Sequence, residues 1–242
     1  MIKYIDLKNT LRNKRFILFT LLVPSFWYVF MVFSAHSGGY WSQKYAYIWY
    51  MASALIGILG NSIVTFAKKI SASKRFFLLQ LHISDYSLGR WIKDQLFTQI
   101  ILNTLIQLVI LIVGLLMGAI KIDLIVLVSL LLVIVLGIYF SIIGFLLGIY
   151  VDSKTLDTIG TPIMMVLAMV VVPFHTFMSG TLADMITYFQ QLFPGYYVYQ
   201  IVLKMLTNRP VGADYLGLIL TFIIIILPIL FVSWRGKLQE NR

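Results

Sequence analysis

The sequence predicts an all-α protein that crosses a membrane several times. Of its 242 residues, 60% are hydrophobic and only 12% are charged, whereas soluble domains average about 45–50% and about 25%. The few charged residues stand between long apolar runs, so they cannot cover the surface of a water-soluble domain. The absence of Cys also excludes a disulfide-bonded scaffold and thiolate chemistry.

Six apolar runs are long enough for a spanning helix, which needs about 20 residues. They cover residues 16–35, 46–67, 95–119, 123–149, 158–178 and 215–234. The first run follows a basic segment, as in a signal peptide, but it is too long for one and is interpreted as a retained anchor. Residues 1–15 are expected to form an amphipathic helix on the inner surface. Residues 1–242 then form a single transmembrane domain.

Lys and Arg are distributed unevenly between the connections. With both termini in the cytoplasm, 15 of these residues lie in inner segments and four in outer loops. Cytoplasmic segments of membrane proteins carry such an excess, which predicts this orientation. The same distribution explains the net charge of +10 without a nucleic-acid partner.

Two connections contain more than a turn. Residues 68–94 form a basic inner segment that is predicted to be a cytoplasmic loop with a short coupling helix. Residues 179–214 contain two apolar runs that are too short to span, separated by Pro194 and Gly195. This second connection predicts a re-entrant helical hairpin on the outer side.

The chain has no evident energy source of its own. It contains no G-x-x-x-x-G-K-[ST] sequence, so no nucleotide site of that type is expected. Ion-coupled carriers place charged residues at membrane depth, but the acidic residues near the spans lie at their ends: Asp94, Asp123, Asp152 and Asp157. His36, His82 and His175 are too scattered to predict a metal site. No catalytic residue, metal or cofactor is therefore assigned to this chain.

Uncharged polar residues form a regular pattern in the third run. They recur every four residues and therefore share one helix face: Gln95, Gln99, Asn103 and Gln107. They either pack through interhelical hydrogen bonds or line a route across the membrane. The sequence leaves both interpretations open.

The order and spacing of these features resemble the type-2 permeases of ATP-binding cassette exporters. The basic entry into the first span resembles the corresponding segment of these permeases; it reads LRNKRFILFTLLVPSFWYVF at Leu11–Phe30. The segment that leads into the third span also resembles its counterpart and reads ISDYSLGRWIKDQLF at Ile83–Phe97. The outer hairpin resembles theirs in FMSG, followed by LFPGYYVYQIVLKML, across Phe177–Leu206.

The resemblance implies a permease subunit in the plasma membrane of a bacterial cell. It would pair with a second permease, identical or different, and contact membrane lipid, while a separate cytoplasmic ATPase subunit would bind ATP and Mg²⁺. Drugs, antimicrobial peptides, lipids or lipid-linked glycans would move outward. The implied route involves the first, second and fifth spans, with these candidates: Trp27, Phe30, Asn61, Thr65, Met165, Met169 and Phe177.

The inner segment is the predicted contact with the ATPase. It combines basic and large apolar residues: Lys74, Arg75, Phe76, Phe77, Leu78, Leu79 and Leu81. Such a cluster usually marks an interaction site, and contact with the inner leaflet is the rival interpretation. The competing functional class is a channel, or a non-transporting scaffold that anchors a peripheral partner through this basic segment.

Overall fold

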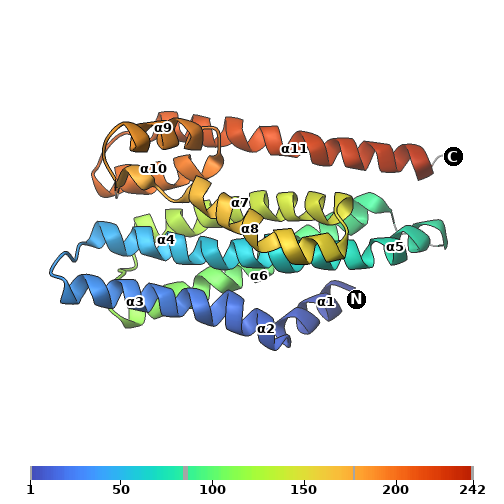
Figure 1. Ribbon diagram of the computed structural model, residues 1–242, viewed down its shortest axis with the longest axis horizontal. Helices are drawn as coiled ribbons and strands as arrows, with labels where there is room; N and C mark the ends of the chain where they lie inside the picture. The colour runs from blue at the N-terminus through green and yellow to red at the C-terminus, as the bar shows by residue number, and fades with distance from the viewer. Residues whose placement is uncertain (1, 84–86, 177, 241–242) are drawn as a thin grey trace.

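The computed structural model describes residues 2–83, 87–176 and 178–240, which form a bundle of helices (Figure 1). No β-strand occurs in these ranges. Five helices are long and apolar enough to cross a membrane: Ile17–Ser37, Gln43–Phe77, Leu88–Leu116, Leu124–Tyr150 and Ser153–Val171. The predicted all-α architecture is therefore confirmed, and five helices, where six were predicted, have the length and apolar composition of membrane spans. The sixth apolar run lies within the helix Gly212–Glu240.

The elements follow one another with short connections. In chain order they are α1 (Ile2–Leu11), α2 (Lys14–Phe16), the π-helical η1 (Ile17–Leu22), α3 (Val23–Ser37), α4 (Gln43–Leu59), the π-helical η2 (Gly60–Phe66), α5 (Ala67–Ile83), α6 (Leu88–Leu116), α7 (Leu124–Tyr150), α8 (Ser153–Val171), the 3₁₀ turn η3 (Phe174–Thr176), α9 (Thr181–Gln190), α10 (Pro194–Leu206) and α11 (Gly212–Glu240).

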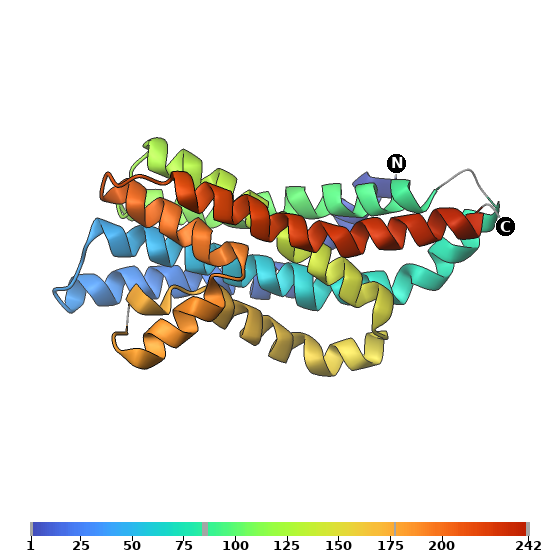
Figure 2. The same cartoon turned by 90° about the horizontal axis from the view of Figure 1, so that it is seen from above.

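The long helices run up and down, so that their connections gather at two ends. One end holds α1, the carboxyl ends of α5 and α11 and the start of α6 (Figure 1). The opposite end holds the α3–α4 and α6–α7 turns together with α9 and α10 (Figure 2). These are called the α1 end and the hairpin end. The described parts of the basic segments 1–15 and 68–94, which were predicted to share one side of the membrane, lie at the α1 end.

Polar side chains fix the starts of four helices. The side chains of Ser42, Ser87, Asp123 and Asp152 each accept a hydrogen bond from a backbone N–H in the following turn, which satisfies donors that a helix start leaves unpaired. The bonds that the Asp152 carboxylate accepts from the Thr155 hydroxyl and backbone lower its pKa. The aspartates at the predicted span ends thus include two helix caps.

The inner connection differs from the loop expected over residues 68–94. The second span continues without a break through η2 into α5 and ends at Ile83. No Gly or Pro occurs between Gly60 and Gly89, so nothing in the sequence interrupts the helix. The Ser71 hydroxyl also donates to the Val151 carbonyl at 2.8 Å, which ties α5 to the end of α7.

The closest approaches of a glycine to another helix backbone join η2 and α5 to α7. A Cβ added at Gly144 would lie 2.0 Å from the Ser62 carbonyl oxygen, and one at Gly148 would lie 2.6 Å from that of Ala67. Only glycine allows the two backbones to approach so closely. This contact gives the fold a fixed centre, around which the other helices pack.

Candidate functional site

The predicted contact segment is the carboxyl end of α5, and its residues face two directions. Phe77 points inward, with 9% of its surface exposed. Its ring stacks on Trp91 of α6, with ring centroids 4.7 Å apart. Both belong to a buried cluster that includes Phe66 and Phe145. Phe77 therefore packs inside this chain, whereas the sequence predicted it as a contact with the ATPase.

Another face of α5 is open. Phe76 and Leu79 are 65% and 68% exposed, and Arg75 beside them is exposed as well. These three residues form what is called the α5 surface. Lys74 instead turns toward α7, where its Nζ donates to the Ile149 carbonyl at 3.1 Å. The side chains of Leu78 and Leu81 lie outside the part of the chain that the structure describes.

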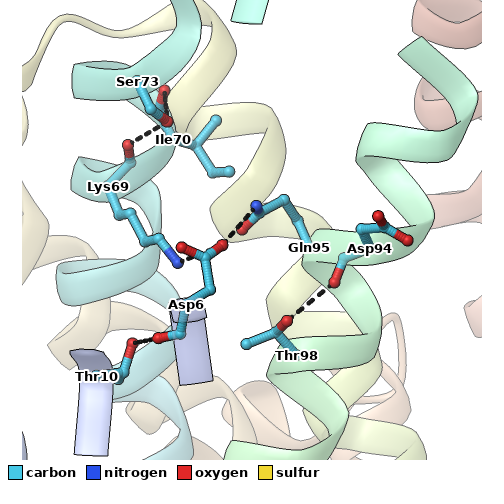
Figure 3. Close-up of polar contacts among 8 residues, drawn as sticks. All are labelled: Asp6, Thr10, Lys69, Ile70, Ser73, Asp94, Gln95 and Thr98. Atoms are coloured by element: carbon cyan, nitrogen blue, oxygen red, sulfur yellow. Dashed lines mark hydrogen bonds and ion pairs between the residues drawn. The ribbon is translucent and has the colours of Figure 1, made fainter. Parts of the chain in front are cut away.

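The amino-terminal helix is attached to this region by an acidic residue. Asp6 pairs with Lys69 of α5 at 3.1 Å and accepts a hydrogen bond from Gln95 of α6 at 3.0 Å (Figure 3). Leu7 and Leu11 pack on the core, while Lys8 and Arg12 are exposed, so α1 has the two faces expected of residues 1–15. The Asp6 contact was not predicted from the sequence, where its signal was a single acid among the basic residues of that segment.

The candidate route residues do not meet in one lining. Asn61 is buried and hydrogen-bonds to α6. Thr65, also on η2, is half-buried, as is Trp27 on α3. The other described candidates, Phe30 of α3 and Met165 and Met169 of α8, are exposed. Phe177 lies outside the described residues. Within one chain, these residues therefore lie partly inside the bundle and partly on its surface.

The helices α3 and α8 keep an open apolar face. Only 22% of the most apolar stretch is buried in each of these spans. The exposed side chains include Phe26 and Phe33 on α3 and Val166 on α8. Such faces suit contact with lipid or with another membrane subunit.

The polar residues of α6 participate in packing. Asn61 of η2 donates to Gln99 at 2.7 Å and to Asn103 at 2.9 Å. Asn103 in turn donates to the Ser141 hydroxyl of α7 at 3.1 Å. All four side chains are buried. The observed bonds therefore favour the packing interpretation for this part of the stripe.

The predicted hairpin runs are present as α9 and α10. Pro194 begins α10 at a position where its missing N–H leaves no hydrogen bond unmade. Gly195 lets α10 approach α8, because a Cβ there would lie 2.8 Å from Val171. Gln190 of α9 donates to the Met169 and Val172 carbonyls at the end of α8 at 3.0 and 2.6 Å. The hairpin is thus fastened to the fifth span.

The titratable groups at the hairpin end are separated from one another. His175 contacts the Gln200 amide at 3.1 Å, and burial, with a smaller effect from Lys44, lowers its pKa. Lys204 pairs with the buried Asp214 at 2.6 Å. Among the described residues, no three His, Cys, Asp or Glu side chains come close enough to hold a metal ion.

Comparison with known proteins gives no assignment: no protein-family model, curated protein or solved structure matches the chain. The functional interpretation therefore rests on the residues and on their arrangement. Two features stand out in that arrangement. They are the α5 surface and the open faces of α3 and α8.

Proposed function

We propose that this chain is the membrane-spanning permease subunit of an ATP-driven exporter. A separate cytoplasmic ATPase subunit would bind ATP and Mg²⁺ and would dock on the α5 surface. The main support is the exposure of two large apolar residues and a cation, Phe76, Leu79 and Arg75, at the end of one helix. An exposed apolar cluster with a charged rim is typical of a protein interaction site.

The position of the α5 surface suits the transmission of movement. It lies on a helix that continues through η2 into α4 without a break. Inward-facing Phe77 and Ile70 tie this end of the helix to α6 and α7. A partner that pushes on Phe76 and Leu79 would therefore move a helix that runs through the centre of the bundle.

The proposed topology places the α1 end in the cytoplasm. The excess of Lys and Arg in the segments at this end supports the assignment. In the proposal α11 crosses as the sixth span, and α9 and α10 enter the outer leaflet without crossing it. The membrane would be the plasma membrane of a bacterial cell.

A second permease subunit would cover the open faces of α3 and α8. The route would then lie between the two subunits, which places Phe30, Met165 and Met169 on its walls although they lie on the outside of one chain. Aromatic and Met side chains adapt to varied apolar shapes. The substrate class would be a hydrophobic or amphipathic molecule such as a drug, an antimicrobial peptide, a lipid or a lipid-linked glycan.

The test is affinity purification of the full chain from native membranes, followed by identification of the co-purifying subunits and assay of ATP hydrolysis. We expect an ATPase subunit with the wild-type chain and at least tenfold less of it with Leu79→Asp. Leu124→Asp is the matched control, because Leu124 is equally exposed at 67% but begins α7 at the hairpin end. That variant is expected to retain the ATPase.

Two results would contradict the proposal. One is a wild-type chain that brings down no ATPase. The other is an ATPase that remains bound and active with Leu79→Asp. A partner without ATPase activity that is lost with Leu79→Asp would instead identify the chain as a non-transporting scaffold.

A further inference from the structure

One face of α6 carries four amides at intervals of four residues, and a single partner lies between two of them. Asn61 of η2 donates to Gln99 Oε1 at 2.7 Å and to Asn103 Oδ1 at 2.9 Å. Asn103 Nδ2 also donates to the Gly137 carbonyl of α7 at 3.2 Å. These four residues, Gln95, Gln99, Asn103 and Gln107, are called the amide ladder.

The last member of the amide ladder is buried without a partner. Gln107 is 0% exposed, and neither its Oε1 nor its Nε2 bonds to any group in the described part of the chain. At the other end of the ladder, Gln95 donates to Asp6 while its own Oε1 is buried and unbonded. Unpaired buried polar groups destabilise a fold, so each requires an explanation.

The four-residue spacing of the amide ladder offers an explanation for the unpaired Gln107. Four residues of an α-helix rise by about 6 Å. If α6 moved by this distance toward its amino terminus, Asn103 and Gln107 would take the present places of Gln99 and Asn103 beside Asn61. Gln107 would then face the Asn61 amide and the Gly137 carbonyl. Gln99 would come to Asp6, and Gln95 would come to the present place of Trp91.

One apolar contact of α6 allows the same step. Gly57 of α4 faces Ile106, whose Cγ2 would lie 2.7 Å from an added Cβ, and the residue four positions later is Ile110. Both isoleucines are fully buried, so one would replace the other against the same glycine. By contrast, α7 meets η2 backbone to backbone at Gly144. The centre of the bundle is fixed, whereas α6 contacts it through repeating side chains.

One contact favours the register that the structure describes. Trp91 of α6 is buried in the aromatic cluster, stacked on Phe77 and edge-on to Phe145 at 5.4 Å. The same displacement of α6 would bring Gln95 to this place and break the stacking. The described register thus gains aromatic packing and leaves Gln107 unpaired, whereas the shifted register pairs Gln107 and loses the packing.

We propose that α6 exchanges between two registers one helical turn apart, with Asn61 bonded to Gln99 and Asn103 in one and to Asn103 and Gln107 in the other. One-turn steps of a helix past its neighbour are an established type of switching transition. Because Trp91 packs on α5, a partner that displaces α5 would shift the balance between the registers. The exchange itself belongs to this chain and does not depend on the proposed ATPase.

Spin-label distance measurements on the purified full chain test the proposal. The chain contains no Cys, so the pair Lys44→Cys and Lys93→Cys introduces the only two labels. Both residues are exposed, one on α4 at the hairpin end and one on α6 at the α1 end. We expect two distances that differ by about 6 Å, the longer one from the shifted register. The control pair Lys44→Cys and Tyr150→Cys, with the second label on α7, should give one distance.

Three substitutions change the populations in a defined way. Trp91→Ala should increase the share of the longer distance. Gln107→Met, which keeps the length of the side chain and removes the amide, should reduce that share at least tenfold, whereas Gln107→Asn should retain it. An unchanged control-pair distance shows that each variant is folded, and Gln107→Leu replaces Gln107→Met if that variant fails this check. A single distance in both the wild type and Trp91→Ala, or a longer distance that persists without the amide, would overturn the proposal.

Discussion

The second span differs from the first and the fifth in how much of it the chain itself covers. In its most apolar stretch, 78% of the second span is buried, compared with 22% in each of the other two. All three have the length and apolar composition of a spanning helix. The contrast separates a centre that one chain completes from surfaces that it leaves open.

The difference indicates which helices belong to the fold and which are available to partners. The second span and α7 meet through glycines at backbone distance, so the two helices are expected to move together. The open faces of α3 and α8 have no comparable contact within the described chain. A second subunit can replace lipid on the open faces of α3 and α8 at little cost in free energy, because lipid tails and the surface of such a subunit are both apolar.

The largest expected effect comes from α5, which extends the buried second span beyond its apolar stretch. Phe77→Ala should lower the free energy of unfolding by about 3 kcal/mol, because it leaves a cavity beside Trp91. Phe76→Ala, one position earlier on the exposed face, should change it by less than about 0.5 kcal/mol. Thermal unfolding in detergent measures both. Equal losses would show that the two faces of α5 do not differ as described.

A smaller effect is expected where the second span meets its two glycine-bearing neighbours. Gly144→Ala on α7 places a Cβ 2.0 Å from the Ser62 oxygen and should destabilise the chain by about 1–3 kcal/mol. Gly160→Ala on α8 places a Cβ 3.8 Å from Val64, which is ordinary contact, and the gain in helix propensity is about 1 kcal/mol. The same unfolding assay should therefore give shifts of opposite sign. A stabilising Gly144→Ala would refute the fixed centre.

Much of the fold could be predicted from the sequence because hydrophobicity determines where helices cross a membrane. The runs at 95–119 and 123–149 correspond to α6 and α7 within a few residues at most ends. The end of the fifth run was set too late, at residue 178, because apolar Val172 and Pro173 continue the hydrophobic pattern after the helix ends at Val171. Hydropathy does not register the loss of helical geometry there.

The arrangement of the candidate site was less accessible to sequence reasoning. Phe76 and Phe77 are neighbours of the same type, and only the rotation of α5 against α6 decides which of them is buried. Similarly, the spacing of Gln99 and Asn103 predicted a shared face, but not that Asn61 would lie between them. Such contacts join residues far apart in the sequence, and no local pattern specifies them.

The most direct test of the central claim is cross-linking in native membranes from a single cysteine on an open face. Val166→Cys on α8 and Leu131→Cys on α7 are matched positions, 60% and 64% exposed, in a chain without other cysteines. With a short, membrane-permeant bifunctional reagent, Val166→Cys is predicted to join the chain to a second membrane subunit, whereas Leu131→Cys is predicted to leave it single. Equal cross-linking from both positions, or none from Val166→Cys, would contradict the assignment of the open face to a permease partner.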